Sequence, residues 1–357
     1  MSIYKDFNIE LPNSVNSSDV VTNIKDTVSS GMWANGSGTI TAYYTSSTQS
    51  SSNHQYFLDV YSANPQSDST ARPQFSIAYG HIHGSGSTGA VGTDGNRASA
   101  TVYRQLSQTL LGPNEEKFTF AGSGTNITPP FVYAISVSRG QLREKMDPGN
   151  WELHLSSSDT TAGFGSPGNA YIKLIDDSGA TTDPSVNQGG RVFNVVSGSI
   201  ASGTAVTDTT ATAQPGGAYG LFYPDLGIVV LNGSVLNISA SLSAGSGSNV
   251  EGGNVGKFFT SITGASKFQA RREEIITSQH YFCRVPNKEF NFSSNPTFTT
   301  GSNGSFTVPT FYKNPKSFIT QVGLYNDNNE LLAIAKLSKP LLKSYSREAI
   351  IKVKLDF

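Results

Sequence analysis

The residues best suited to chemistry in this chain are two histidines, His81 and His83, separated by one isoleucine. Alternate residues of a strand point to the same face, so a strand over Gln74–His83 would present both imidazoles together. Imidazole nitrogens bind transition metals, but a structural zinc site needs about four ligands. We therefore treat His81 and His83 as weak metal candidates. The alternative is two polar residues at a strand end beside a glycine-rich loop.

Asp147 and Glu152 form a carboxylate pair of the kind that glycosidases use. Asp147 lies in an expected Pro-Gly turn, where an aspartate usually bonds the local backbone. Glu152 begins an expected strand, so the spacing by itself does not bring the two carboxylates together. We assign no catalytic residue to this pair.

The remaining reactive side chains suggest no site. His54, His154 and His280 are scattered among expected strands and indicate no catalytic triad. Cys283 is the only cysteine, which excludes an intrachain disulfide, and we expect it to be a small core residue. The run Arg271–Glu274 is expected to be a solvated helix face or an intersubunit patch of salt bridges.

Two glycine-rich segments resemble nucleotide-binding loops without meeting their requirements. Gly84–Gly89 satisfies GxGxxG, but more loop follows it where a dinucleotide site needs a helix. Gly252–Lys257 lacks the glycine spacing of a phosphate-binding loop, and Phe258 stands where Ser or Thr is required. The chain also lacks the GxSxG elbow of hydrolases. We therefore expect no cofactor and no enzymatic activity.

Composition points to a turn-rich β protein without an electrostatic partner. Charged residues make up only 14% of the 357 residues and the formal net charge is −1, which predicts neither nucleic acid nor a membrane surface as partner. No apolar run reaches the ~18 residues of a membrane span, and the start of the chain is not expected to be a secretory signal. The 36 glycines favour many tight turns.

The residue patterns predict a mainly β fold, with several β-sandwich or barrel-like antiparallel units and one or two short helices. Helices are expected at Arg97–Leu111, where apolar residues recur every four positions, and at Ala265–Ile276, with a helical turn near Gly140–Lys145. Loops are expected at Ser197–Gly217 and Ser239–Gly256. Strands are expected at Thr39–Tyr44, Gln55–Tyr61, Gln74–His83, Phe131–Ser138, Trp151–Leu155, Tyr171–Ile175, Arg191–Val196, Gly227–Leu231 and Gln279–Val285.

The C-terminal part gives the clearest pattern. Asn326–Asn329 predicts the turn of a hairpin between Ser317–Tyr325 and Glu330–Leu337. Pro340 is expected to break the ladder after it, because proline has no N–H to donate. Ala349–Phe357 alternates apolar and charged residues and is expected to be the last strand of the same antiparallel sheet, where it either closes the fold or joins a neighbouring subunit. The expected domains are 1–125, 126–264 and 265–357, with packing of the last domain against the central one left open.

Several segments resemble a family of virion structural proteins from large contractile-tailed phages of marine cyanobacteria. The likeness rests on Phe131–Leu155, Tyr171–Val196, Leu221–Leu231, Arg272–Asn295 and the C-terminal residues 323–357. It covers about two thirds of the chain, mostly residues 70–357, and brings no active site with it.

The resemblance implies a non-enzymatic structural role in the phage tail or its baseplate. It implies contacts with other virion proteins, a homo-oligomer in a symmetric ring, and assembly in the host cytoplasm. Two alternatives stay open: another virion part, such as a head decoration, neck or fibre-attachment protein, and a carbohydrate-binding adhesin or depolymerase.

Overall fold

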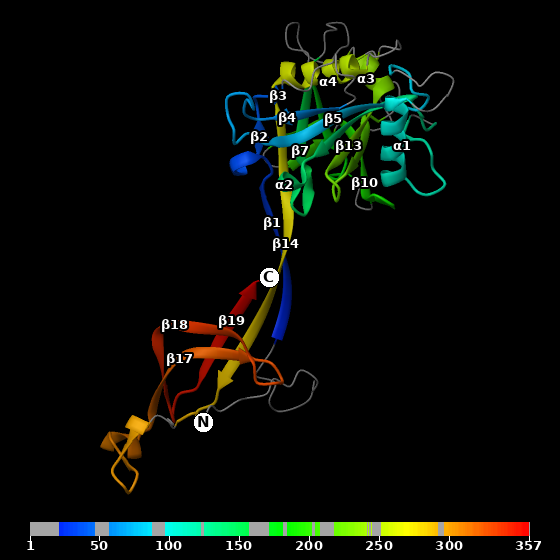
Figure 1. Ribbon diagram of the computed structural model, residues 1–357. Coiled ribbons are helices and arrows are strands. Elements are labelled where there is room, and N and C mark those ends of the chain that lie inside the picture. The colour runs from blue at the N-terminus through cyan, green and yellow to red at the C-terminus, as the bar shows by residue number, and fades with distance from the viewer. Residues whose placement is uncertain are drawn as a thin grey trace. The chain divides into compact units, whose positions relative to one another are not determined.

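The structure is a computed structural model (Figure 1) that describes residues 21–46, 57–87, 97–122, 125–156, 171–180, 184–201, 204–207, 218–240, 242, 244, 251–291 and 296–356. Strands account for 50% of the residues and helices for 17%, which confirms the mainly β class. Every strand pair with a defined register is antiparallel, and one sheet curls into a half-barrel. None of the helices in these ranges has the length and apolar character that crossing a bilayer requires.

The chain divides into two compact units rather than the three domains expected. The large unit is Val28–Glu274, and the small unit combines Met1–Thr27 with Ile275–Phe357. A boundary at residue 125 is wrong because β5 (Pro73–His81) pairs with β6 (Phe131–Val137) along its length. The two segments on either side of the expected boundary therefore share one sheet and one core.

The sheet of the large unit follows the order β14-β7-β8-β10-β12-β13-β6-β5-β4-β3. Trp151, Phe222, Tyr133 and Phe75 are fully buried in its main core cluster. The other strands of this unit are β2 (Thr39–Ile40), β3 (Tyr44–Thr45), β4 (Phe57–Tyr61), β7 (Lys145–Ser156), β8 (Tyr171–Asp176), β9 (Ser185–Asn187), β10 (Gly190–Ala201), β11 (Thr204–Thr207), β12 (Gly220–Tyr223) and β13 (Ile228–Asn232). Two further strands, β1 (Val21–Gly31) and β14 (Phe268–Val285), contribute residues to both units.

Helices cover the sheet of the large unit (Figure 1). The expected helix is confirmed as α1 (Ala98–Leu110), which packs Tyr103 and Leu110 into a second core cluster with Phe118. The turn near residue 140 is confirmed as α2 (Arg139–Leu142). The remaining helices are α3 (Gly233–Ala240), α4 (Glu251–Ala265) and the short 3-10 turn η1 (Ala34–Gly36).

The expected helix at Ala265–Ile276 is wrong, because α4 ends at Ala265 and β14 begins at Phe268. Phe268 and Ala270 are fully buried, whereas Gln269 and Arg271 are not. Burial therefore alternates with every residue, which is the two-residue period of a strand. The charges of Arg271–Glu274 lie on this strand and not on a helix face.

Both expected loops contain regular structure. Ser239–Gly256 includes the first residues of α4, where three glycines lower the helix propensity but Val255, Phe258 and Ile262 bury one face in the main core. Burial therefore outweighs local propensity in α4. Within Ser197–Gly217, β10 continues to Ala201 and β11 pairs back on it, and residues 208–217 lie outside the described ranges.

The small unit contains two layers of strands. In one layer β14 pairs with the terminal strand β19 (Ala349–Asp356), from Ser278 opposite Asp356 to Val285 opposite Ala349. The other layer is the hairpin of β17 (Lys316–Tyr325) and β18 (Leu331–Ser344). A short pair, β15 (Thr299–Thr300) and β16 (Ser305–Phe306), lies between the 3-10 turns η3 (Pro296–Phe298) and η4 (Pro309–Tyr312).

The hairpin turn is confirmed. Asn329 has φ 61°, and the side-chain oxygen of Asn326 accepts the N–H groups of Asn328 and Glu330. The terminal strand is confirmed, but the single sheet expected over residues 317–357 is wrong: β19 pairs with β14, and it meets the hairpin face to face through Leu324, Ile351 and Val353. When β19 pairs edge to edge with β14, which is distant in sequence, its apolar face packs against the hairpin, and this burial favours the observed pairing.

Pro340 interrupts the ladder as expected, although β18 resumes beyond it. Gln321 pairs with Lys336, whereas Ile319 pairs with Leu341. Residues 337–340 therefore bulge out of register opposite a single residue of β17.

Candidate functional site

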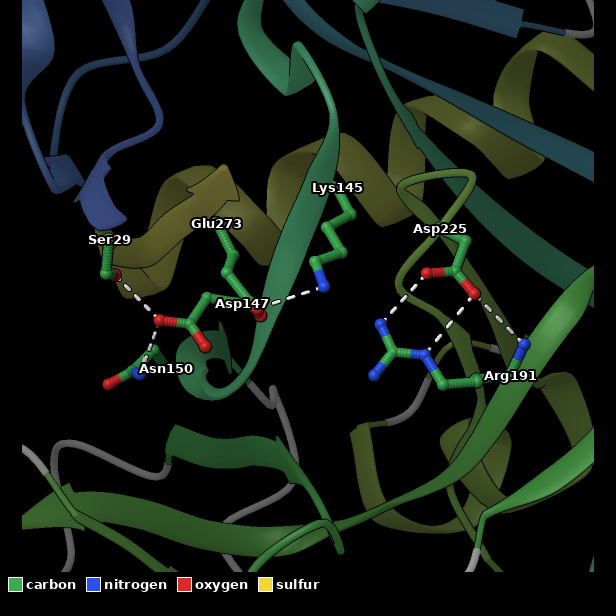
Figure 2. Close-up of polar contacts among 7 residues, drawn as sticks. All are labelled: Ser29, Lys145, Asp147, Asn150, Arg191, Asp225 and Glu273. Carbon is green, nitrogen blue, oxygen red and sulfur yellow. Dashed lines mark hydrogen bonds and ion pairs between the residues drawn. The ribbon is translucent and has the colours of Figure 1, made fainter. Parts of the chain in front are cut away.

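The candidate site is a set of seven polar residues of the large unit, drawn in Figure 2 and called here the ionic cluster: Ser29, Lys145, Asp147, Asn150, Arg191, Asp225 and Glu273. They come from β1, the start of β7, β10, the turn after β12, and β14. These segments are far apart in sequence, and the antiparallel pairing of β7 with β14 brings several of them together.

Arg191 and Asp225 form the most complete ion pair of the ionic cluster. The guanidinium Nη2 lies 2.9 Å from Oδ1 and the Nε lies 3.4 Å from Oδ2, while the backbone N–H of Arg191 donates to Oδ2 at 3.1 Å. The hydrogen bond to Asp225 raises the pKa of Arg191. Partial burial acts to raise the pKa of Asp225, but the hydrogen bonds from Arg191 outweigh it and lower that pKa. Both groups are thus held in their charged forms.

The other acids of the ionic cluster are also engaged. Glu273 lies opposite Lys145 in the β7–β14 ladder, and their side chains meet at 2.9 Å. Asp147 accepts hydrogen bonds from Ser29 Oγ and Asn150 Nδ2, each at 2.7 Å (Figure 2). A general acid or base must reach a substrate proton, and here each carboxylate is already bound by a neighbour. This arrangement suits carboxylates that hold neighbouring strands in position better than carboxylates that transfer protons.

Glu152 belongs to a second polar network, on the face of β7 that is turned away from the main core. Its Oε1 accepts hydrogen bonds from Lys267 Nζ at 2.9 Å and from His154 Nε2, and its Oε2 accepts the backbone N–H of Ile200 at 2.7 Å. Burial acts to raise the pKa of Glu152, but the bonds from His154, Ile200 and Lys267 outweigh it and lower the pKa to about 2. Glu152 is therefore ionised at neutral pH, which makes it unsuited to donating a proton.

The structure thus separates the two carboxylates that the sequence grouped. Asp147 and Glu152 both lie on β7, but their hydrogen-bond partners are different residues. Sequence reasoning missed Lys145, Arg191 and Lys267, because each contacts a carboxylate at least 34 positions away along the chain. No local spacing signals such pairs.

The two candidate metal ligands lie at the end of β5. Their ring centroids are 6.1 Å apart, and the backbone N–H of His83 donates to His81 Nδ1 at 3.1 Å. The His81 ring stacks on Phe131 at 6.4 Å with an interplanar angle of 4°, and burial together with His83 lowers the pKa of His81. Across the described ranges, no group of three or more His, Cys, Asp or Glu side chains is arranged to hold a metal ion.

The other sequence candidates occupy structural positions. His280 lies on β14 opposite Lys354, and Cys283 is packed at the edge of the small unit's core. Arg272 bonds Ser30 Oγ at 2.9 Å and pairs with Glu274 at 3.3 Å, and both partners belong to the same large unit. Residues 84–87 form a turn after β5, and Gly252–Lys257 is part of α4. His54 and residues 88–90 lie outside the described ranges.

Comparison of the sequence with protein-family models and curated proteins, and of the chain with solved structures, gives no match.

Proposed function

We propose that this protein is a non-enzymatic structural component of a phage virion, and that it supplies subunit contacts in the tail or baseplate. The resemblance of its segments to phage virion proteins supports the placement. The observation that carries the structural role is a patch of exposed apolar side chains on the small unit. This patch is called the hairpin patch and comprises Tyr325, Leu331, Leu332 and Ile334.

The hairpin patch lies on the side of the β17–β18 hairpin that faces away from the core. Leu332 is 68% exposed and Ile334 is 50% exposed, whereas Leu324 on the opposite side is 9% exposed. Gly323 pairs with Ile334, and the side chains of Tyr325 and Leu331 extend over the space that a Cβ of Gly323 would fill. Tyr325, Leu331 and Ile334 therefore gather around Gly323, and the exposed Leu332 follows Leu331 directly on β18.

Such a surface favours an assembled state. Exposed apolar patches mark protein–protein contact sites, and each large side chain contributes about 1.5–3 kcal/mol when a partner buries it completely. Most of the other exposed large apolar side chains also lie in the small unit, among them Tyr312, Phe318 and Ile350. The small unit is the part of the chain that best fits subunit contacts.

The proposed lack of enzymatic activity has its own support. The acids of the ionic cluster and Glu152 are bound to cations or hydrogen-bond donors of the protein itself, which supports a structural role for them. Incubation of the pure protein with bacterial envelope material should release neither reducing sugar nor phosphate. Catalytic release of either would overturn this part of the proposal and favour the depolymerase.

The placement is tested by locating the chain in the particle. Antibodies against the purified protein should label intact phage particles, and an electron cryomicroscopy map of those particles should contain the chain in the tail or baseplate. Labelling confined to the head or neck would favour the alternative virion part. Absence from purified particles would reject the proposal.

A pair of variants tests the hairpin patch itself. Leu332→Glu places a charge in the patch, and Lys336→Glu alters a charge on an exposed residue of the same strand. We expect Leu332→Glu to abolish incorporation into particles without lowering the thermal midpoint, and Lys336→Glu to incorporate normally. Normal incorporation of Leu332→Glu would show that the patch is not a subunit contact.

A further inference from the structure

One end of the β17–β18 hairpin is both apolar and acidic. Residues 325–335, which comprise the turn and the hairpin patch, include Asp327 and Glu330 and neither lysine nor arginine. Both acids are exposed, and Glu330 directly precedes Leu331 of the hairpin patch. This end of the small unit therefore presents an apolar surface bordered by negative charge.

The other end of the hairpin is apolar and basic. Residues 312–318, which lead into β17, include Lys313 and Lys316 and no acid. Both lysines are exposed, and so are Tyr312 (81%) and Phe318 (63%). These four residues are called here the lysine end. The large exposure of Phe318 places its ring on the side of the hairpin that faces away from the core, and the hairpin patch lies on the same side.

Neighbouring segments leave the lysine end positive. Two acids, Glu289 and Glu348, lie in segments near the base of the hairpin. Glu348 pairs with Arg284 at 2.9 Å, and Glu289 attracts the buried ammonium group of Lys343. Each of these acids therefore has a basic partner, and the lysine end keeps its net positive charge.

The length of β17 separates the two ends. Lys316 pairs with Ser344 at one end of the hairpin, and Tyr325 pairs with Leu331 at the other. The ten residues of β17 rise about 3.3 Å each, which places the two ends about 30 Å apart. One copy of the chain therefore cannot bring its own hairpin patch and lysine end together, whereas two copies can.

We propose that the partner of the hairpin patch is the lysine end of a second copy of this chain. The contact buries apolar side chains of both copies and places Asp327 and Glu330 of one copy near Lys313 and Lys316 of the other. A pair joined in this way still exposes one hairpin patch and one lysine end, so further copies add head to tail into a ring or a chain. This inference rests on the proposed subunit contacts and identifies the partner in them.

Charge argues against a two-fold contact between the same surfaces. Two hairpin patches that meet about a two-fold axis bring Asp327 and Glu330 beside the same acids of the other copy, and like charges repel. Two whole hairpins packed face to face and antiparallel avoid this clash. They instead bring the exposed Lys336 of each copy together, because Lys336 lies opposite Gln321 near the middle of the hairpin. The head-to-tail contact avoids both repulsions.

Charge reversal in the purified full chain tests the head-to-tail contact. The acid-reversed variant is Asp327→Lys/Glu330→Lys, and the lysine-reversed variant is Lys313→Glu/Lys316→Glu. In sedimentation velocity at low salt, the parent should form species larger than a dimer. Each variant alone should self-associate about tenfold more weakly, because like charges then meet at the contact. An equimolar mixture of the two variants restores opposite charges at every contact and should associate as the parent does.

A matched control makes the same change of charge away from both ends. Lys336→Glu/Lys339→Glu reverses two exposed lysines of β18 and should associate as the parent does. Thermal unfolding of each variant shows whether it is folded. If a double variant does not fold, the single substitutions Asp327→Lys and Lys316→Glu replace the two reversed variants in the same experiment.

Three results would overturn the inference. The first is a parent chain that stays monomeric or stops at the dimer, and the second is a mixture of the reversed variants that does not recover association. The third is association of the acid-reversed variant with the parent together with no effect of the lysine-reversed variant, which would indicate a two-fold contact between hairpin patches. If the pure chain stays monomeric while Leu332→Glu still blocks incorporation into particles, the proposed function holds, and this inference alone fails.

Discussion

Glu152 and Lys267 lie 115 positions apart in the chain, yet their side chains meet at 2.9 Å in the large unit. The side chain of Glu152 is only 2% exposed, and its other contacts come from His154 and the backbone of Ile200. The carboxylate thus links β7 to the residue that precedes β14 and to the end of β10. A buried acid with this many donors contributes to stability only while it is ionised.

Replacing Glu152 with Gln should destabilise the protein. The amide keeps the shape but loses the charge that strengthens three hydrogen bonds, at a cost of about 1.5–3 kcal/mol. Urea unfolding measures the loss. Glu116→Gln removes a carboxylate from an exposed position and should change the free energy of unfolding by about 0.5 kcal/mol or less. Equal effects of the two substitutions would show that the network adds nothing to stability.

The stability should depend on pH in a defined acidic window. The pKa of Glu152 is about 2 in the folded protein and near its ordinary value of 4.5 in the unfolded chain. Between these values the unfolded chain binds a proton that the folded protein does not bind, so stability falls as the pH falls. The contribution is complete above pH 4.5 and is lost toward pH 2. Urea midpoints between pH 6 and pH 2 should show a smaller decline for Glu152→Gln than for the parent.

Truncation of two neighbouring isoleucines of β19 should destabilise the protein to very different extents. Ile351 is 8% exposed and packs in the core of the small unit, whereas Ile350 is 62% exposed. Ile351→Ala should cost about 2–5 kcal/mol through lost burial and a residual cavity. Ile350→Ala should cost about 0.5 kcal/mol or less. Similar losses in thermal unfolding of the two variants would mean that the facing of β19 is wrong.

The two tryptophans should differ in their response to phenylalanine. Both are buried, but the Nε1 of Trp33 donates to the Phe268 carbonyl at 3.1 Å, and the Nε1 of Trp151 has no acceptor among the described residues. Trp33→Phe loses packing and a hydrogen bond, whereas Trp151→Phe loses packing alone. We expect Trp33→Phe to cost about 1 kcal/mol more in urea unfolding. A larger loss for Trp151→Phe would contradict this reading.

His81 and His83 should hold no structural metal in the monomer. A pair leaves about two of four coordination positions unfilled by protein, and the Nδ1 of His81 already accepts a backbone hydrogen bond. Elemental analysis of the purified protein should find zinc and iron well below one equivalent. A stoichiometric metal that is lost in the His81→Ala/His83→Ala double variant would disprove this prediction.

Local patterns in the sequence determined the mainly β class, the helix α1, and the hairpin at Asn326–Asn329. These features depend on residues within about ten positions of one another, such as the four-residue spacing of Val102, Leu106 and Leu110. The same patterns misread Ala265–Ile276, where the end of a helix and the start of a strand follow each other closely. At this position, whether a residue is helical or extended depends on the distant segments that pack against it.

Only the tertiary structure decided which strands pair and which polar groups meet. The partner of β19 is β14 and not the nearer hairpin, and the ionic cluster joins Arg191 to Asp225 and Lys145 to Glu273. Alternation along a strand indicates which face is buried but does not identify the neighbouring strand. Strand pairing depends on the total apolar surface that the whole fold buries. Segments far apart in the chain contribute to this total, so no local stretch of sequence can predict it.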